Sequence, residues 1–321
     1  MDNESYRSAV AGEIEAVISE GGLPSALREK LRACLAAPGR ILSPTRHSPW
    51  SLAPILCCRS ASGGSWKQSL PLAAAMEVFI TATDLLDDLQ DDDTEWKANA
   101  QNLQLLATFL LLPNVAILRL KEKGVGAEKT VGAFQLFTRL AAQAGVGQFN
   151  DIRQESEQAV SLEQALETTA LKSASLMQCA CQLGALVGSD DEALAQQYGR
   201  FGWYLGLFAQ LLNDMRDITS ERRAKSDLKL GKKTVPLVFA LNAPEGDARA
   251  ERVRAFVATT GDRAVEEREA HQSLKDMGAV HFTWVLAEVQ RLLARNILRS
   301  ISALGYSVDE LVALVDKHQR T

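Results

Sequence analysis

The chain has 321 residues and 46% of them are hydrophobic, so it can bury a large core. Its formal net charge of −5 and isoelectric point near 5.6 give no global basic field, which argues against nucleic acid as the main partner. Residues 1–36 are polar and lack the apolar run of a secretory signal, so we expect a cytoplasmic protein. The five cysteines form no Cys-x-x-Cys pair and have no nearby histidine, which favours buried free thiols over a zinc site.

Helical spacing of apolar residues recurs along the chain between short breaks that contain Gly, Pro, Asp or Asn, and strand signals are weak. The pattern predicts an all-α fold with helices near 3–20, 24–37, 49–61, 68–94, 98–122, 128–145, 162–188, 190–220, 232–242, 247–258, 263–276, 280–303 and 307–319. Without a repeat or a linker, the simplest organisation is a single domain, residues 1–321. The longest apolar stretch, residues 103–120, is interrupted by Gln104, Pro113 and Asn114, which favours a core helix over a membrane span.

An aspartate run at the end of the apolar helix that begins near Leu70 is the most informative feature. Asp84, Asp87, Asp88 and Asp91 fall at positions i, i+3, i+4 and i+7, so their carboxylates project from one stripe. Like charges at this spacing destabilise a bare helix, and the helix macrodipole disfavours anions at a C-terminus. A bound divalent cation removes both penalties, and hard oxygen ligands suit Mg²⁺. Taken alone, such a run is more often a solvated acidic helix end.

A second polar cluster on another apolar helix strengthens the metal interpretation. Gln210, Asn213, Asp214 and Asp217 share one helix face, and Glu221 continues that face one turn later. Two opposed carboxylate stripes in a helical bundle can hold metal ions between them, above a pocket walled by apolar side chains. Because Mg²⁺ shares its coordination shell with water and phosphate oxygens, a diphosphate would complete the site.

Cationic side chains accompany the two clusters. Lys172 precedes Ser173 inside an apolar helix, where an unpaired ammonium group is costly to bury. Other cations surround or follow the second cluster, namely Arg216, Lys225, Lys232 and Lys233. For each lysine, a surface position with a partly buried stem remains an alternative. Together with metal ions, these groups would stabilise the charge that develops on an anionic leaving group.

These residues resemble the motifs of the trans-isoprenyl diphosphate synthase family, also called polyprenyl synthetases. Asp87-Asp88-Leu-Gln-Asp91 is similar to the first aspartate-rich motif of the family, and Asn213-Asp214-Met-Arg-Asp217 after Gln210 is similar to the second, with Asn in place of its first Asp. The Lys-Thr element of the family resembles Lys172-Ser173 here, and its Gly-Gln-x-x-Asp turn resembles Gly147-Gln148-Phe-Asn-Asp151. The conserved tail segment of the family resembles Asp227-Leu-Lys-Leu-Gly231-Lys232-Lys233-Thr234-Val-Pro236. The matches keep the family order across roughly residues 70–240.

The resemblance implies an all-α class I isoprenoid synthase bundle with a central active-site cavity, usually homodimeric and dependent on Mg²⁺. It implies an allylic prenyl diphosphate as substrate and three metal ions, with Mn²⁺ as a substitute. The metal ligands implied are Asp87, Asp88, Asp91, Asn213, Asp214, Asp217 and Glu221. The implied diphosphate ligands are Lys172, Arg216, Lys225, Lys232 and Gln210.

Two departures from the family pattern favour a terpene cyclase. Chain-elongating members bind isopentenyl diphosphate with a Gly-Gly-Lys-Arg segment and an arginine pair after the first motif. Here those segments read Pro38-Gly39-Arg40-Ile-Leu-Ser-Pro44 and Asp93-Thr-Glu-Trp96-Lys97-Ala, with Arg40, Arg46, His47 and Lys97 as partial substitutes. In addition, Asn213, Asp217 and Glu221 at i, i+4 and i+8 resemble the metal-binding triad of class I terpene cyclases, with Asp217 where Ser or Thr is usual.

Ionisation of an allylic diphosphate leaves a carbocation that must be kept from water, and aromatic faces can stabilise it. The candidate pocket residues are Phe79, Thr83, Phe149, Trp203 and Phe208, with Tyr204 beside them, although aromatic residues at helical spacing are more often plain core. In the family, bulky side chains four and five positions before the first motif limit the hydrocarbon chain. The small Ala82 and Thr83 at those positions favour a substrate longer than the shortest prenyl diphosphate, unless Phe79 closes the pocket one turn deeper.

The leading interpretation of the sequence is therefore a terpene synthase, or cyclase, built on the prenyl synthase scaffold. The alternatives are a chain-elongating trans-isoprenyl diphosphate synthase and a prenyltransferase that acts on a non-isoprenoid acceptor such as a peptide tryptophan. The non-enzymatic alternative is a regulatory subunit of a heteromeric synthase. Such subunits usually lose one aspartate cluster, whereas this chain retains both.

Overall fold

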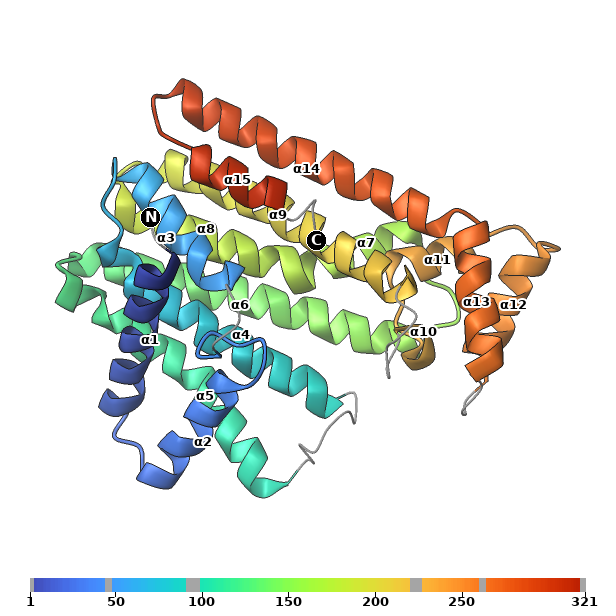
Figure 1. Ribbon diagram of the computed structural model, residues 1–321, viewed down its shortest axis with the longest axis horizontal. Helices are drawn as coiled ribbons and strands as arrows, with labels where there is room; N and C mark the ends of the chain where they lie inside the picture. Colours follow the sequence, from blue (N-terminus) through green and yellow to red (C-terminus); the bar gives the residue numbers. More distant parts are fainter. Residues whose placement is uncertain (1–2, 44–47, 91–98, 220–226, 260–263, 318–321) are drawn as a thin grey trace. The chain divides into compact units, whose positions relative to one another are not determined.

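The computed structural model describes residues 3–43, 48–90, 99–219, 227–259 and 264–317. Within these ranges every regular element is helical and no strand occurs, as Figure 1 shows. The all-α prediction is therefore confirmed.

The helices follow the predicted order along the chain. They are α1 (Asn3–Glu20), α2 (Ser25–Ala36), α3 (Pro49–Ala61), α4 (Leu70–Gln90), α5 (Ala100–Leu118), α6 (Ala127–Glu155), α7 (Leu162–Thr169), α8 (Ser175–Gly188), α9 (Glu192–Thr219), α10 (Asp227–Leu230), α11 (Val235–Leu241), α12 (Ala248–Val257), α13 (Ala264–Asp276), α14 (Ala279–Ala303) and α15 (Asp309–Lys317). Two 3₁₀ turns, η1 (Lys67–Ser69) and η2 (Arg119–Lys123), and one π-helical turn, η3 (Ala170–Ala174), complete the described elements.

Two differences from the predicted helices bear on the site. The predicted helix 128–145 continues to Glu155, so the segment from Gly147 to Asp151 is helical and does not form a turn. The predicted helix 162–188 contains the π-helical turn η3, which separates α7 from α8 without ending the helix. Glycines caused the first error because they weaken a helix, although a helix tolerates them where another element packs closely.

The chain forms two compact units, each assembled from segments that are distant in sequence. The first unit comprises Met1–Thr138, Cys179–Gly199 and Ser300–Leu311, and the second comprises Arg139–Gln178, Arg200–Arg299 and Val312–Thr321. The chain passes repeatedly between the units, so no single linker divides it. The single-domain organisation stays a prediction.

Helix α4 is the central element of the first unit and contacts α1, α3 and α5. Its side chains are buried all round from Leu70 to Ala82, as expected for a helix inside a bundle. Glu77 is 4% exposed, and its Oε1 accepts a hydrogen bond of 2.9 Å from the backbone N–H of Ser51 near the start of α3. The buried carboxylate thereby satisfies a backbone donor that the first turn of α3 leaves unpaired.

Two helices of the described chain are long and apolar enough to cross a membrane by length and composition. One includes η1 and α4, and 83% of its most apolar window is buried inside the protein. The other includes α5 and η2, with 50% of the window buried and Leu103, Leu111 and Leu118 exposed. Core helices pass the same test, so the finding alone does not indicate a membrane span. All five cysteines are free and buried, which confirms the interpretation of their spacing.

The second unit has a satellite core around the end of α9. Its buried residues are Ile218, Leu228, Leu237, Ala240, Val253, Phe256, Ala270, Leu274 and Ala279, contributed by six helices from α9 to α14. Ile218 directly follows Asp217 in the chain, so this cluster fixes the helix end that carries the second aspartate motif.

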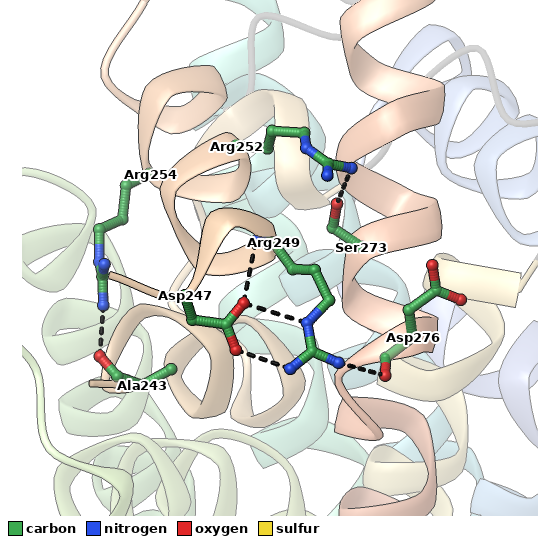
Figure 2. Close-up of polar contacts among 7 residues, drawn as sticks. All are labelled: Ala243, Asp247, Arg249, Arg252, Arg254, Ser273 and Asp276. Carbon is green, nitrogen blue, oxygen red and sulfur yellow. Dashed lines mark hydrogen bonds and ion pairs between the residues drawn. The ribbon is translucent and has the colours of Figure 1, made fainter. Parts of the chain in front are cut away.

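Polar contacts join the two outer helices of this satellite core, α12 and α13 (Figure 2). Asp247 accepts a hydrogen bond from the backbone N–H of Arg249 at the start of α12 and forms an ion pair of 2.7 Å with its guanidinium. The same guanidinium donates to the carbonyl oxygen of Asp276 at the end of α13, at 2.9 Å. Arg252 donates to Ser273 Oγ at 3.4 Å. These contacts join α12 to α13 beside the apolar cluster.

Close contact between α3 and α8 makes a stability prediction for the first unit. A Cβ atom at Gly184 would lie 2.2 Å from the carbonyl oxygen of Pro54 and 2.7 Å from its Cα. We expect Gly184→Ala to lower the melting temperature by several degrees, because overpacking typically costs about 1–3 kcal/mol. The matched control is Gly132→Ala, whose nearest neighbour would be Leu186 Cδ2 at 3.9 Å. Equal melting temperatures for both variants, measured by circular dichroism, would contradict the close-contact argument.

Candidate functional site

The ammonium group of Lys172 has a carboxylate partner that the sequence did not assign. Lys172 Nζ donates to Asp151 Oδ2 at 2.8 Å, and the two side chains are 30% and 17% exposed. Asp151 belongs to the part of α6 that extends beyond its predicted end, and Lys172 lies in the π-helical turn η3. Both residues belong to the second unit. The cost of burying Lys172 is therefore offset by an ion pair.

A line of hydrogen bonds leads from η3 to the second aspartate motif on α9. Ser173 Oγ donates to Gln210 Oε1 at 3.0 Å, and Gln210 Nε2 donates to Asp214 Oδ1 at 2.8 Å. The amide of Gln210 thus accepts from one side and donates to the other, which fixes its orientation. The predicted common face of Gln210 and Asp214 is confirmed by this i, i+4 contact.

Asp214 is 3% exposed, and its burial raises the pKa of its carboxyl group to about 7. The negative charges of Asp227 and Asp151 raise the pKa further, whereas the Gln210 hydrogen bond and the Lys172 charge lower it. Desolvation is the largest of these effects, so the neutral form of Asp214 persists to near-neutral pH.

Asp217 connects the end of α9 to the tail segment. Its Oδ2 accepts a hydrogen bond of 2.9 Å from the backbone N–H of Asp227, the first residue of α10. Burial raises the pKa of the Asp227 carboxyl group to about 6, and the charge of Asp217 adds to the rise, against the charges of Lys232 and Lys172. Asp217 is 4% exposed and Asp227 is half-buried, so two carboxylates lie close together here with little access to water.

The adjacent lysines of the tail segment have different environments. The positive charge of Lys232 lowers the pKa of Asp227, which places this lysine near the acidic cluster. Lys233 Nζ instead donates to the carbonyl oxygen of Glu155, the last residue of α6, at 3.2 Å. Burial lowers the pKa of Lys233. Lys233 therefore caps a helix C-terminus and is not the surface lysine that the sequence allowed.

The first aspartate motif occupies the last turns of α4 in the first unit. Asp87 and Asp88 are half-buried, and Asp84 is exposed. The guanidinium of Arg40, from the segment after α2, forms an ion pair with Asp84 one turn before Asp87. A cation thus lies beside the first motif although no Gly-Gly-Lys-Arg segment is present.

Several predicted site residues fall outside the described residues or cannot be brought together. Asp91, Glu221 and Lys225 lie outside the described ranges, as do Arg46, His47 and Lys97. Asn213 is exposed and Arg216 is half-buried on α9. The two motifs belong to different units, each of which is described by itself. Their predicted opposition across a cavity therefore stays a prediction.

The predicted pocket residues differ in their surroundings. Phe208 is fully buried in the second unit, and Trp203 and Tyr204 are half-buried there. In the first unit, Thr83 is half-buried, and Phe79 is 8% exposed, with its ring edge-on to Phe137 at 5.2 Å between centroids.

The pocket assignment of Phe149 is not supported by its position, because its side chain is 66% exposed on α6. Val146 and Ile152 are exposed on the same helix, at i−3 and i+3. Phe149 was a pocket candidate because it is an aromatic residue close to the motifs in sequence. In a helix, however, residue 149 points away from the face that carries both end residues.

The oxygen donors of the second unit fit Mg²⁺ by their chemistry. No group of three His, Cys, Asp or Glu residues converges to hold a metal ion in the part of the chain that the structure describes. Mg²⁺ does not require such a cage, because it commonly takes one or two carboxylates and completes its shell with water and phosphate. The raised pKa values of Asp214 and Asp227 indicate poorly compensated negative charge, which a divalent cation would neutralise.

Three residues of this network were present in the matched segments but were not assigned to the site. They are Asp151, Ser173 and Asp227. Asp151 follows Gly147 at i+4, which on a continuous helix places both on one face, but the predicted helix ended before them. Asp227 could have been assigned to the site because it is an acidic residue shortly before Lys232 and Lys233 in the sequence.

The raised pKa of Asp214 predicts the pH dependence of stability. Between its unfolded value of 3.8 and about 7, the folded chain holds a proton that the unfolded chain has released, so the free energy of unfolding falls as pH rises. The Asp214→Asn variant keeps the oxygen that accepts the hydrogen bond from Gln210 but cannot titrate. With a chelator present, we expect its melting temperature to fall less than that of the parent chain between pH 5 and about 8. Asp190→Asn is the control, because Asp190 is exposed and its ion pair with Lys129 lowers its pKa. Parallel pH profiles for all three proteins would rule out a titrating Asp214.

Curated relatives share both sequence and length with this chain. The chain is 28% identical to the geranylgeranyl diphosphate synthase of Mycobacterium tuberculosis over 274 residues, which cover 81% of this chain and 76% of that protein. It is 29% identical to a dimethylallyltranstransferase of Fischerella ambigua over 275 residues, covering 75% of this chain and 79% of the relative.

Solved structures share the fold. The crystal structure of a polyprenyl synthetase from Streptomyces coelicolor A3(2) matches with a TM-score of 0.83 and 24% identity, over 98% of each chain. A polyprenyl synthase from Caulobacter crescentus CB15, complexed with calcium and isoprenyl diphosphate, matches with a TM-score of 0.76 and 23% identity, over 98% of this chain and 94% of that one. The model of the polyprenyl synthetase family matches residues 51–275. This match covers well over half of the chain and keeps the order of the motifs, so the chain belongs to the polyprenyl synthetase family.

Proposed function

We propose that the chain is a chain-elongating prenyltransferase that joins an allylic prenyl diphosphate to isopentenyl diphosphate and releases inorganic diphosphate. The carbon–oxygen bond of the allylic substrate breaks with both electrons leaving on the diphosphate. The double bond of isopentenyl diphosphate then attacks the allylic carbon, and the new cation loses a proton. Family membership and the relatives named above, which are synthases of prenyl diphosphates, favour this alternative over the cyclase that the sequence ranked first.

One contact in this chain weakens the case for the cyclase. That case rested mainly on the missing basic cradle for a second diphosphate. The ion pair of Arg40 with Asp84 brings a guanidinium to the last turns of α4, one turn before Asp87 and Asp88 in the helix. Such a planar group can bind two phosphate oxygens through two parallel hydrogen bonds, a geometry that lysine does not offer. We infer that Arg40 contributes to binding isopentenyl diphosphate.

The remaining roles follow from charge and from donor type. We propose that Asp87, Asp88, Asn213 and Asp217 provide oxygen ligands for Mg²⁺, and that Lys172, Arg216 and Lys232 bind the departing diphosphate. When bound, the metal would stabilise negative charge on the leaving group. The calcium and isoprenyl diphosphate bound by the Caulobacter crescentus relative support this combination of ligands. The half-buried contacts of Lys172 with Asp151 and of Ser173 with Gln210 orient these groups in advance, which is the main requirement for electrostatic catalysis.

We also propose a homodimer. Large apolar side chains are exposed on α5 and on the first part of α6 in the first unit, namely Leu103, Leu111, Leu118, Val131 and Phe134. In the second unit, α6 exposes Val146, Phe149 and Ile152. Large apolar side chains that recur exposed along a helix are typical of a protein–protein interface.

Substrate mixtures test the reaction class. We expect longer prenyl diphosphates when Mg²⁺, isopentenyl diphosphate and an allylic primer (dimethylallyl, geranyl or farnesyl diphosphate) are present, and no hydrocarbon or alcohol from an allylic diphosphate alone. Liquid chromatography with mass spectrometry identifies the products. Hydrocarbon or alcohol formed without isopentenyl diphosphate would restore the cyclase. In a further mixture that contains a tryptophan peptide in place of isopentenyl diphosphate, a prenylated peptide would indicate a non-isoprenoid acceptor. Inertness in every mixture would favour a regulatory subunit.

Replacing Arg40 tests its assigned role. We expect Arg40→Ala to raise the KM for isopentenyl diphosphate by about tenfold or more, the effect of losing a charge-assisted hydrogen bond, and to change the KM for the allylic substrate less than about threefold. Arg59→Ala is the control, since Arg59 forms a similarly exposed ion pair with Glu310. If both KM values rise equally, Arg40 supports the whole site and not the second substrate.

A further inference from the structure

We propose that Gly147 and Gly206 are positioning residues that allow the π-helical turn η3 to approach α6 and α9 closely enough for Lys172 and Ser173 to reach their partners. The proposal rests on the function proposed above, because it concerns how the diphosphate-binding lysine is held in place. All residues involved belong to the second unit.

On the α6 side, the turn meets a glycine that leaves no room for a methyl group. A Cβ atom at Gly147 would lie 2.2 Å from the backbone nitrogen of Lys172, 2.6 Å from its Cα and 2.6 Å from the carbonyl carbon of Leu171. These are backbone atoms, so they can move only if the turn moves. Asp151, four residues further along the same face of α6, binds Lys172 Nζ at 2.8 Å. One face of α6 therefore fixes both the backbone and the side chain of this lysine.

The α9 side repeats the arrangement. A Cβ atom at Gly206 would lie 2.8 Å from Ala174 Cα, 2.9 Å from Met177 Cβ and 3.3 Å from the carbonyl oxygen of Ser173. Gln210, four residues later on α9, accepts the hydrogen bond of 3.0 Å from Ser173 Oγ. On each helix, a glycine sets the distance to the turn, and a polar residue at i+4 binds one of its side chains.

The turn itself has a wider hydrogen-bond pattern than an α-helix. The backbone N–H of Ser175 donates to the carbonyl oxygen of Ala170, five residues earlier. The hydroxyl group of Ser175 donates to the carbonyl oxygen of Leu171 at 2.6 Å. A π-helical turn inserts one extra residue into a helix, is uncommon and occurs mostly at functional sites. Because Ser175 is fully buried, its hydroxyl provides this carbonyl with a partner where water does not reach.

The test measures binding of inorganic diphosphate with Mg²⁺ by isothermal titration calorimetry, together with kcat and KM for the allylic substrate. We expect Gly147→Ala and Gly206→Ala each to weaken diphosphate binding by about tenfold, the effect of misplacing one charge-assisted contact. Gly145→Ala on the same helix is the control, because no atom lies within 4 Å of its added methyl group. Its binding should equal that of the parent chain.

A double-mutant cycle separates positioning from general packing. If the glycines act through the lysine, Gly147→Ala should have no further effect on diphosphate binding in a Lys172→Ala background. An equal loss in both backgrounds would overturn the proposal, as would parental affinity in both glycine variants. If neither glycine variant folds, Ser175→Ala adds no bulk and should still weaken binding by about threefold, and parental affinity in this variant would equally reject the role of the turn. A parent chain that binds diphosphate but forms no prenyl product would count against the proposed reaction alone.

Discussion

The burial of carboxylates close to other negative charges is the main constraint on the second unit. Asp214 and Asp217 are almost fully buried, and the negative charges of Asp151 and Asp227 raise the pKa of Asp214. Lys172 is the shared counter-charge, since it pairs directly with Asp151 and lowers the pKa of both Asp214 and Asp227. The effect of burial is still larger than the effect of Lys172, because the pKa values of Asp214 and Asp227 remain raised. The cluster is thus a local cost in stability, of the kind that proteins retain where function requires it.

The position of Lys172 follows from this constraint. A single cation must lie near three carboxylates on three different helices, α6, α9 and α10. A regular α-helix between α6 and α9 offers few ways to direct two adjacent side chains, one toward each neighbour. The π-helical turn η3 aims Lys172 at α6 and Ser173 at α9. The close approach of the backbones requires glycine on both sides, although glycine in a helix interior costs roughly 1 kcal/mol relative to alanine. The two glycines lower the helix propensity of α6 and α9, and they allow both helices to contact η3 closely.

Periodicity predicted most of the helices because it reports burial, and burial of one face is what stabilises a helix in a folded protein. It was wrong about the end of α6, where Gly145 and Gly147 suggested a break and the helix continues to Glu155. That error hid the common face of Gly147 and Asp151. Contacts along one helix, such as Gln210 with Asp214, were predictable from spacing alone. Contacts between helices, such as Lys172 with Asp151, depend on which faces meet, and no local pattern encodes that.

The basic motifs that are absent from this chain show a second limit of predicting function from sequence motifs. The sequence lacks the basic segments that bind the second diphosphate in the family, and this absence favoured a cyclase. A motif, however, reports cations at expected positions, whereas binding depends on where a cation lies in space. Arg40 belongs to a loop that is 44 residues away from Asp84 in sequence, yet it pairs with this carboxylate at the first aspartate motif. Since a guanidinium can exchange a carboxylate partner for a phosphate with the same paired geometry, an ion pair at this place is compatible with binding a second substrate. The departure from the motif therefore does not by itself exclude elongation.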